Sequence, residues 1–346
     1  MNNIALAAHS ALYTGRRSMG SRTAALLFLL LWLFTTAWGG ASRCRSGINP
    51  IACFPPYEAN IVAGLVPEAS NVCGREGRER VCHLVGSTGM VAGTCDYCDS
   101  SDPSSAHPPE HITDVHSTDA VTYWQSQNHT VVQYPNSVNI TFSLNRTFDI
   151  RNILVTFHSS RPESYIILIS TDFGRTYSPL QYYSQSCNGT YGLEEGSLCS
   201  AEEARLAPSS GGQVVLFINP SQEATNVRLK FDRLNTFGDE VITMDPQVLD
   251  SYYYAVSNVE ISGRCACNGH ASDCFQNMCV CEHNTMGQNC EQCRSFFQDQ
   301  PWSAATPDNP SECRGREETA TARNLSLFCG CRSGQGLLIL SFRGVL

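Results

Sequence analysis

The sequence predicts an all-β protein, in which an antiparallel, jelly-roll-like β-sandwich over residues 42–264 is followed by one small disulfide-rich module over residues 265–313. Two observations predict this fold. In the first segment, short runs rich in Val, Ile, Tyr and Phe are separated by Gly, Pro, Asn and Ser, and no long helical period occurs. In the second, apolar runs vanish and Cys, Gly and Asn dominate, so a fold of about 50 residues there needs disulfides in place of a core.

The clearest strand lies at residues 138–144, where apolar and polar side chains alternate strictly. Such alternation places one set of side chains in the core and the other in water. The apolar set is Val138, Ile140, Phe142 and Leu144. Further strands are expected at residues 153–157, 165–170, 213–218, 227–231 and 252–261. The continuous apolar run at residues 165–169 is typical of a central strand buried on both faces.

Four N-x-Ser/Thr sequons predict N-linked glycans. Their asparagines are Asn128, Asn139, Asn145 and Asn188. Asn139 and Asn145 extend the polar set of the strand at residues 138–144, and a glycan needs an exposed side chain, so these sequons support the orientation given to the strand. A glycosylated face is not expected to bind another protein.

The 18 cysteines fall mainly into two even groups. Eight lie between Cys44 and Cys199, and eight lie between Cys265 and Cys313. Because each group could close on itself, we expect two units that no disulfide joins, with a boundary near residue 264. Several pairings remain open within each group, since the sequence alone does not determine the connectivity.

The first 41 residues are typical of a signal peptide. Three arginines precede an apolar run at residues 24–34, and small residues follow at Ala37, Gly39 and Ala41. The run has 11 residues, well short of the roughly 20 that span a bilayer. We therefore expect a secreted chain with no membrane span, in which disulfides are the normal state of cysteine.

Composition and motifs exclude several classes of function. The net charge of −9 is not that of a nucleic-acid-binding protein. The sequence carries none of the usual hydrolase, phosphate-binding or dinucleotide-binding signatures, so we expect no enzyme. The Cys-x2-Cys pairs that begin at Cys95 and Cys290 have the spacing of zinc ligands, but in a secreted chain they are interpreted as structural disulfide partners.

Several segments, in order along both units, resemble the laminin N-terminal domain followed by a laminin-type EGF-like module, as found in laminins and netrins. They include Cys95-Asp-Tyr-Cys98, Thr122-Tyr-Trp-Gln-Ser126, Ser160-Arg-Pro-Glu-Ser164, Arg233-Leu-Asn-Thr-Phe-Gly-Asp-Glu240, Ser251-Tyr-Tyr-Tyr-Ala-Val-Ser257 and Gly263-Arg-Cys-Ala-Cys-Asn-Gly-His-Ala-Ser272. The similarity covers about residues 53–313. Within the family, the chain looks most like a laminin γ chain, and netrins are next.

The resemblance implies a disulfide pattern for the EGF-like module. The implied pairs are Cys265 with Cys274, Cys267 with Cys279, Cys281 with Cys290 and Cys293 with Cys313. The chain departs from the family in two places of the sandwich domain. The segment between Cys187 and Cys199 is shorter than usual, and a surface loop after the strand at residues 213–218 is missing. Both departures weaken the transfer of a specific partner.

The resemblance also implies a structural Ca²⁺ ion, which in relatives ties the loop before the Trp-Gln-Ser strand to the last strand of the sandwich. The matching positions are the Asp114 carboxylate, the carbonyl groups of His111 and Thr122, and a contact from Ser257. Oxygen ligands of these kinds suit Ca²⁺. The alternative is that Asp114 only caps a turn.

The function implied by the resemblance is adhesion in the extracellular matrix. The N-terminal domain is expected to bind corresponding domains of laminin α and β chains in a calcium-assisted basement-membrane network, with the EGF-like module as a spacer. Two alternatives remain: a diffusible netrin-like ligand of a cell-surface receptor, and a truncated isoform that competes with the network. The second arises because residues 314–346 do not open another module and are expected to be a divergent, unstructured tail.

Overall fold

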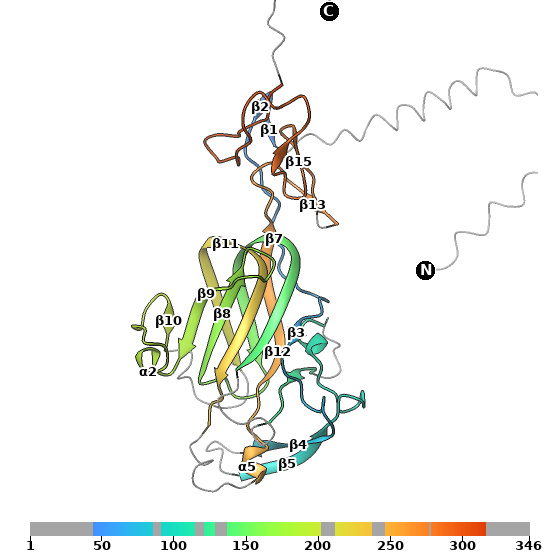
Figure 1. Ribbon diagram of the computed structural model, residues 1–346, viewed down its shortest axis with the longest axis vertical. Helices are drawn as coiled ribbons and strands as arrows, with labels where there is room; N and C mark the ends of the chain where they lie inside the picture. Colours follow the sequence, from blue (N-terminus) through green and yellow to red (C-terminus); the bar gives the residue numbers. More distant parts are fainter. Residues whose placement is uncertain are drawn as a thin grey trace, which may run out of the picture.

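The computed structural model describes residues 44–85, 91–114, 121–128, 137–201, 212–236, 246–276 and 278–315. The expected signal peptide at residues 1–41 and nearly all of the expected tail at residues 314–346 lie outside these ranges. The described part is elongated (Figure 1). A β-sandwich occupies the middle, the disulfide-rich module lies at one end, and a two-stranded hairpin with a short helix lies at the other.

The elements are mostly strands. Those before the main sheet are β1 (Arg45–Ser46), β2 (Asn49–Pro50), β3 (Glu68–Ala69), β4 (Glu79–Val85), β5 (Val91–Cys98), the 3-10 helix η1 (Pro109–Ile112) and β6 (Trp124–Gln125). The main sheet continues with β7 (Val138–Phe157), β8 (Ser164–Ser170), β9 (Ser178–Ser184), helix α2 (Cys187–Tyr191), β10 (Cys199–Ser200), β11 (Gly212–Arg233), helix α5 (Pro246–Leu249) and β12 (Ala255–Cys265). The module holds β13 (Cys274–Phe275), β14 (Met278–Cys279), β15 (Thr285–Met286) and β16 (Gln292–Cys293).

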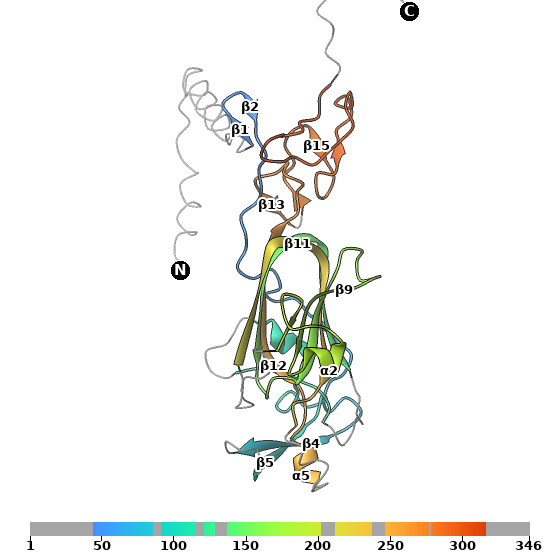
Figure 2. The same ribbon diagram turned by 90° about the vertical axis from the view of Figure 1, so that its left-hand side faces the viewer.

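Two long strands, β7 and β11, contribute to both layers of the sandwich. Residues 138–143 of β7 pair with residues 226–231 of β11, next to β8 and β9. Residues 148–157 of β7 pair with residues 212–224 of β11, next to β12 and β6. Between these halves the two strands bend over together, so that one hydrogen-bonded sheet forms two facing layers (Figure 2).

A change occurs along β7 in which residues face the core. Val138, Ile140, Phe142 and Leu144 are buried, as the alternation predicts. Phe148 and Ile150 keep this parity, but beyond them the buried residues are Ile153, Val155 and Phe157, which is the opposite parity. A register shift between Phe217 and Gln222 of β11 lies opposite the change, and such irregularities bend strands and alter which face a residue occupies.

Aromatic side chains join the two layers. The Phe231 ring of β11 lies 6.0 Å from Phe157, 6.2 Å from Trp124 and 5.1 Å from Tyr254, measured between ring centroids. Phe231 and Trp124 have no exposed surface. Aromatic contacts at these distances stabilise a core by more than the burial of apolar area alone. They hold the layer that contains β8 and β9 directly against β6, the strand that carries Trp124.

The predicted antiparallel sandwich is confirmed, and no long helix occurs among the described residues. β8 covers the run at residues 165–169 and lies between β9 and β11, as a central strand should. The strand expected at residues 252–261 begins later, at Ala255. Tyr252, Tyr253 and Tyr254 are buried in irregular backbone instead, and the Tyr254 amide donates to the Ser126 hydroxyl.

Eight disulfides connect the described cysteines. In the module the bonds are Cys265–Cys274, Cys267–Cys279, Cys281–Cys290 and Cys293–Cys313, which are the four implied pairs. The sandwich domain has Cys44–Cys53, Cys73–Cys98, Cys82–Cys95 and Cys187–Cys199. None of these bonds crosses from one group to the other, so the two units are joined covalently only by the main chain.

The bend of β7 meets the module through one buried arginine. Asn145 adopts a left-handed φ of 60° at the bend, and Arg146 beside it has no exposed surface. The Arg146 guanidinium donates to the sulfur atoms of Cys274 and Cys279 at 2.9 and 3.2 Å, and to the Asn289 side-chain oxygen at 2.9 Å. Burial lowers its pKa, but arginine keeps its charge in proteins.

The N-terminal hairpin forms a second contact between the units. It consists of β1, β2 and the loop closed by Cys44–Cys53, and it packs on the module rather than on the sandwich (Figure 1). The Cys53 amide donates to the Gly269 carbonyl at 3.0 Å. Arg45 forms an ion pair with Glu312 at 2.5 Å. The hairpin therefore belongs spatially to the module, although it precedes the sandwich in sequence.

We predict that Arg146→Ala lowers the free energy of unfolding by about 3 kcal/mol, because it leaves a cavity and an unsatisfied Asn289 oxygen in a buried junction. Arg146→Met fills more of the space and should cost less. Urea unfolding with disulfides intact measures both. Arg151→Ala, at an exposed position of the same strand, is the control. An Arg146→Ala protein as stable as this control would contradict the role of Arg146 at the junction.

Candidate functional site

The expected calcium ligands lie around the loop that runs from η1 to β6. Helix η1 packs against β6 and β12. Ile112, its last residue, is fully buried in the sandwich core. The next residue, Thr113, donates its hydroxyl to the Leu65 carbonyl, and its own carbonyl accepts from the Gly64 amide at 2.7 Å. The backbone on the N-terminal side of Asp114 is therefore tied to the body of the domain.

Asp114 and Thr122 lie in direct contact. The Thr122 hydroxyl donates to the Asp114 carboxylate at 2.7 Å, across a separation of eight residues. Both side chains are half-buried. The structure thus brings together two of the four expected positions, the carboxylate and the residue whose carbonyl is expected to serve as a ligand.

His111 and Ser257 complete the expected set. The His111 imidazole contacts the Tyr123 carbonyl at 3.3 Å. The calcium ligand expected from His111 is its backbone carbonyl, which this contact does not involve. Ser257 lies on β12, directly after Val256, which pairs with Trp124 of β6. Its hydroxyl donates to the Thr156 carbonyl at 3.2 Å and keeps lone pairs that can accept. Ser257 therefore lies on the strand against which η1 packs.

Tyr123, next to Thr122, is held between two histidines. Its ring stacks on His107 at 4.1 Å and on His158 at 3.7 Å, between centroids. Burial, helped by the nearby His111, lowers the pKa of His107 to about 4. Burial also lowers the pKa of His158. Both rings are neutral at pH 7, so the stack fixes Thr122 without bringing a positive charge close to a cation site.

The donor set fits a hard cation. One carboxylate, two backbone carbonyls and a hydroxyl are all oxygen donors, which suit Ca²⁺ and not Zn²⁺. With a single carboxylate, such a site belongs with weak extracellular calcium sites, with dissociation constants of about 10⁻⁴–10⁻³ M. Thr122 is already positioned by its hydrogen bond to Asp114, which reduces the ordering that binding would require.

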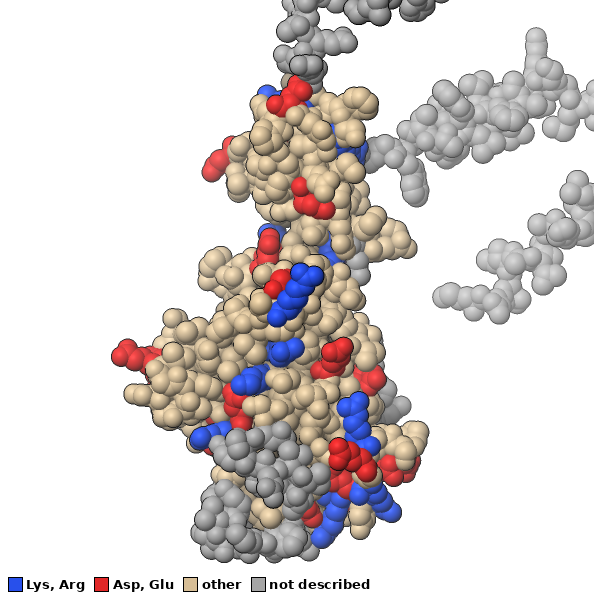
Figure 3. All heavy atoms as spheres, viewed as in Figure 1, with Lys and Arg blue, Asp and Glu red and all other residues tan. Residues whose placement is uncertain are grey.

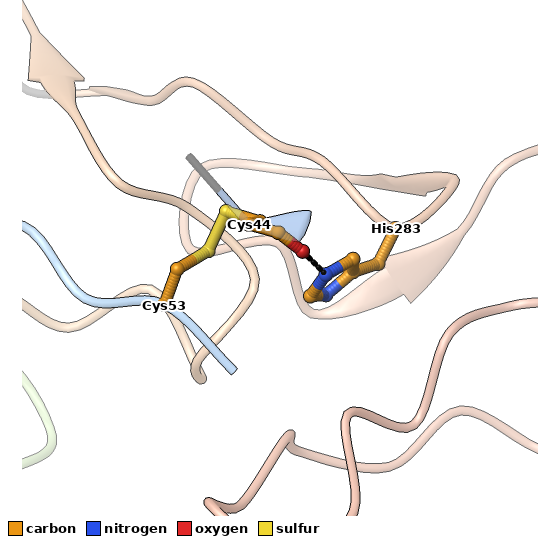
Figure 4. A group of neighbouring side chains, drawn as sticks. All are labelled: Cys44, Cys53 and His283. Carbon is orange, nitrogen blue, oxygen red and sulfur yellow. Dashed lines mark hydrogen bonds between the residues drawn. A yellow bond between two sulfur atoms is a disulfide. The ribbon is translucent and has the colours of Figure 1, made fainter. Parts of the chain in front are cut away.

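A second cluster with metal-ligand atoms is not a metal site. Cys44, Cys53 and His283 lie close together, and within the described ranges they are the group of three such side chains that could surround an ion. The two cysteines are bonded to each other (Figure 4). Zinc binds thiolates, and none is available here. The His283 ring instead faces the Cys44 carbonyl.

Three of the four sequon asparagines have accessible side chains. Asn145 and Asn188 are exposed, and Asn139 is half-buried. The orientation of Asn139 and Asn145 on β7 agrees with the alternation, although Thr141 of the Asn139 sequon is only 7% exposed and its hydroxyl accepts from Arg228. These three positions remain predicted glycosylation sites.

Asn128 does not fit the expectation of a glycan. It is 1% exposed, and its side-chain nitrogen donates to the Arg80 carbonyl at 2.7 Å and to Asp250 at 3.2 Å. Its backbone amide donates to the buried Glu79 carboxylate, whose pKa is raised by burial and lowered by its bonds to Asn128 and Gly74. This burial conflicts with the glycan that the sequon predicts, so we no longer expect one at Asn128.

Charges on the sandwich surface are mixed in sign. On the face in Figure 3, lysine and arginine lie among aspartate and glutamate. Elsewhere in the described structure charges form ion pairs, including Arg264 with Asp149 at 2.9 Å and Lys230 with Asp232 at 2.8 Å. This face presents no broad field of one sign of the kind that attracts polyanions.

Comparison with known families identifies both units. The model of the laminin N-terminal domain (domain VI) matches residues 53–263, and that of the laminin EGF domain matches residues 265–313. The chain belongs to the laminin N-terminal family.

Relatives of this laminin-family chain include laminin γ chains. It is 40% identical over 337 residues to laminin subunit gamma-3 of Homo sapiens, covering 86% of this chain and 21% of that protein. It is 38% identical over 325 residues to laminin subunit gamma-1 of Xenopus tropicalis, covering 84% and 20%. The laminin-like protein lam-2 of Caenorhabditis elegans is 35% identical over 305 residues, covering 78% and 18%. The chain therefore spans about a fifth of the length of these relatives.

None of the helices in the described ranges is both long and apolar enough to cross a membrane. The apolar run at residues 24–34 lies outside those ranges.

We predict that the secreted protein carries glycans at Asn139, Asn145 and Asn188 but not at Asn128. Exposure permits the first three, whereas the Asn128 nitrogen is buried in hydrogen bonds to Arg80 of β4 and to Asp250, which follows α5. Peptide-N-glycosidase treatment of material from a eukaryotic secretory host, followed by peptide mass spectrometry, will show which asparagines become aspartate. Conversion of Asn128 together with no conversion of Asn139 or Asn145 would mean that the faces are assigned incorrectly.

Proposed function

We propose that this chain acts as the N-terminal short arm of a secreted laminin-type matrix protein. In this proposal its sandwich domain binds the N-terminal domains of laminin α and β chains in the basement membrane, and Ca²⁺ assists the contact. The role is adhesive and involves no catalysis. The observation that carries it is the family match over both units, combined with relatives that are laminin γ chains.

A γ-type role is favoured over a netrin-like role by the relatives. Those described above are γ chains or a laminin-like protein, and they align across the sandwich and the module together. The netrin-like alternative, a ligand for a cell-surface receptor, rests on shorter similarities. It is therefore an outcome that the experiment below can detect.

Calcium has a physical task in this proposal. The backbone before Asp114 is fixed by Ile112 and Thr113, and the backbone after Thr122 is fixed by β6. An ion shared by Asp114, the His111 and Thr122 carbonyls and Ser257 would tie both ends of the intervening segment to β12.

The module has a mechanical task. It contributes little apolar core; four disulfides hold it together internally, and the buried Arg146 joins it to the bend of the sandwich. A junction fixed in this way limits hinge motion between the units. We infer that the module keeps the sandwich domain at a defined orientation on its arm.

We predict that the chain forms complexes with laminin α and β N-terminal fragments in Ca²⁺ and that chelator dissociates them. Asp114→Asn should mimic the chelator, because the amide oxygen can still accept from Thr122 while the formal charge is lost. Analytical ultracentrifugation with and without Ca²⁺ measures both effects. We expect the variant to need at least about ten times more Ca²⁺ to form the complex, since the charge of the ligands sets the affinity for Ca²⁺.

Glu223→Gln is the matched control, because it removes one exposed carboxylate from β11, away from the loop. It should behave like the unmodified chain. If no complex forms with either laminin fragment, while the chain binds a netrin receptor ectodomain saturably, the netrin-like role replaces the proposed one. Complexes that are equally strong in chelator and in Ca²⁺ would refute the calcium part alone.

A further inference from the structure

The Cys82–Cys95 disulfide lies in the β4–β5 hairpin, at the end of the molecule opposite the module (Figure 1). Cys82 of β4 and Cys95 of β5 pair directly across the antiparallel ladder. Cys82 has no exposed surface, whereas Cys95 is half-buried. A thiolate that arrives from solvent therefore reaches Cys95 before it reaches Cys82. Exposed disulfides are exchanged more readily than buried structural ones.

A guanidinium group lies beside the Cys95 sulfur. The Arg80 Nη2 atom contacts the Cys95 Sγ atom at 3.4 Å, and the Arg80 Nη1 atom lies 3.7 Å from the Asp250 carboxylate. A positive charge next to a cysteine sulfur stabilises its thiolate. Stabilisation of the reduced form makes a disulfide easier to reduce. Asp250 offsets part of this charge but also holds the guanidinium in place, so Arg80 favours the reduced state of the pair.

A second disulfide encloses this one in the sequence. Cys73 is bonded to Cys98, so both Cys82 and Cys95 lie within the loop that the outer bond closes. A disulfide stabilises a fold mainly by restricting the unfolded chain. With the outer bond intact, opening the inner one frees only a segment that is already closed at both ends. The inner bond therefore contributes less to stability than its own loop would suggest.

The β4–β5 hairpin also has attachments that do not involve the inner disulfide. Val81 of β4 packs in a small buried cluster with Tyr253, which follows α5. The Cys82 amide donates to the Asp250 carbonyl at 3.1 Å. The two strands pair on both sides of the disulfide. The hairpin can therefore stay on the sandwich when the two sulfur atoms separate.

We propose that Cys82–Cys95 is a thiol–disulfide exchange site, at which a dithiol from the surroundings opens the bond while the sandwich stays folded. The dithiol supplies two electrons and ends as a disulfide, and the chain gains two thiols at the end opposite the module. The site is a property of the β4–β5 hairpin and does not depend on the proposed laminin assembly.

The exchange takes two steps. One thiolate of the dithiol attacks the Cys95 sulfur, the bond between Cys95 and Cys82 breaks, and Cys82 leaves as a thiolate. The second thiolate of the dithiol then attacks the dithiol sulfur of the mixed disulfide, and Cys95 leaves as a thiolate beside Arg80. The dithiol is oxidised, the protein pair is reduced, and the two protein thiolates take up the protons that the dithiol released.

A disulfide of the module provides an internal comparison. Cys274 is half-buried, and its sulfur accepts from Arg146 at 2.9 Å, so the Cys265–Cys274 bond shares both chemical features. It differs in its surroundings, because it is interleaved in sequence with Cys267–Cys279 in a module that has little apolar core. Reduction there removes what holds the module together. We therefore expect Cys265–Cys274 to resist reduction more than Cys82–Cys95.

Graded reduction of the full secreted chain tests the proposal. The protein is equilibrated with mixtures of reduced and oxidised dithiothreitol, free thiols are alkylated, and mass spectrometry locates each label. Half reduction of Cys82–Cys95 should need a ratio of reduced to oxidised dithiothreitol at least about tenfold lower than that of Cys265–Cys274. Near-ultraviolet circular dichroism should show a folded sandwich at that ratio. Reduction of Cys265–Cys274 first or together with Cys82–Cys95, or unfolding of the sandwich as Cys82–Cys95 opens, would overturn the proposal.

Charge variants test the part assigned to Arg80. Arg80→Gln should raise the ratio needed for half reduction of Cys82–Cys95 at least about threefold, because the neighbouring charge no longer stabilises the reduced form. Arg80→Lys should largely restore the original ratio. Arg78→Gln is the matched control, since Arg78 lies over the Tyr97 ring of the same hairpin. An unchanged ratio in Arg80→Gln, or an equal change in Arg78→Gln, would refute this part. The order of reduction in the unmodified chain decides the exchange site itself, even where a variant is not secreted.

Discussion

The pairing of β7 with β11 is the constraint on which the rest of the molecule depends. Each strand runs through both layers, so their bend sets the distance between the layers and the position of every other strand. The bend also determines what lies at the end of the sandwich. It exposes Asn145 and directs Arg146 into the module, where the guanidinium contacts two disulfides. A change in the register of this pair would therefore misplace the core, the junction and the module together.

The sequence predicted the parts of this fold that depend on local pattern. Strict alternation at residues 138–144 identified both the strand and its buried face. It did not predict that the strand continues to Phe157 with reversed parity, because the reversal results from extra residues in β11, far away in sequence. β9 and the β4–β5 hairpin were missed, since their polar content hides any period. The sequon at Asn128 misled for a related reason: the motif is local, whereas burial against Glu79 and Asp250 is tertiary.

In the candidate site, too, sequence identifies some residues, whereas others depend on tertiary contacts. Asp114 and Thr122 were selected by resemblance, and the structure places them in hydrogen-bond contact. The elements that fix them could not be found from the sequence. Ile112, Thr113 and the stack of Tyr123 between His107 and His158 act through contacts with strands that lie elsewhere in the chain. No motif marks Arg146, because it is an ordinary residue whose role at the junction arises only from the three-dimensional arrangement.

Apolar and polar contacts divide the molecule into parts that respond differently to the surroundings. The sandwich core is built from aromatic and branched side chains, whose burial depends little on protons or ions. The module has almost no such core, so disulfides hold it together, Arg146 joins it to the sandwich, and an ion pair joins it to the hairpin. A partly exposed ion pair of this kind is weakened by salt. In the proposed function, Ca²⁺ acts on the Asp114 loop while the apolar core of the sandwich keeps its shape. In that proposal the arm changes its contacts without unfolding.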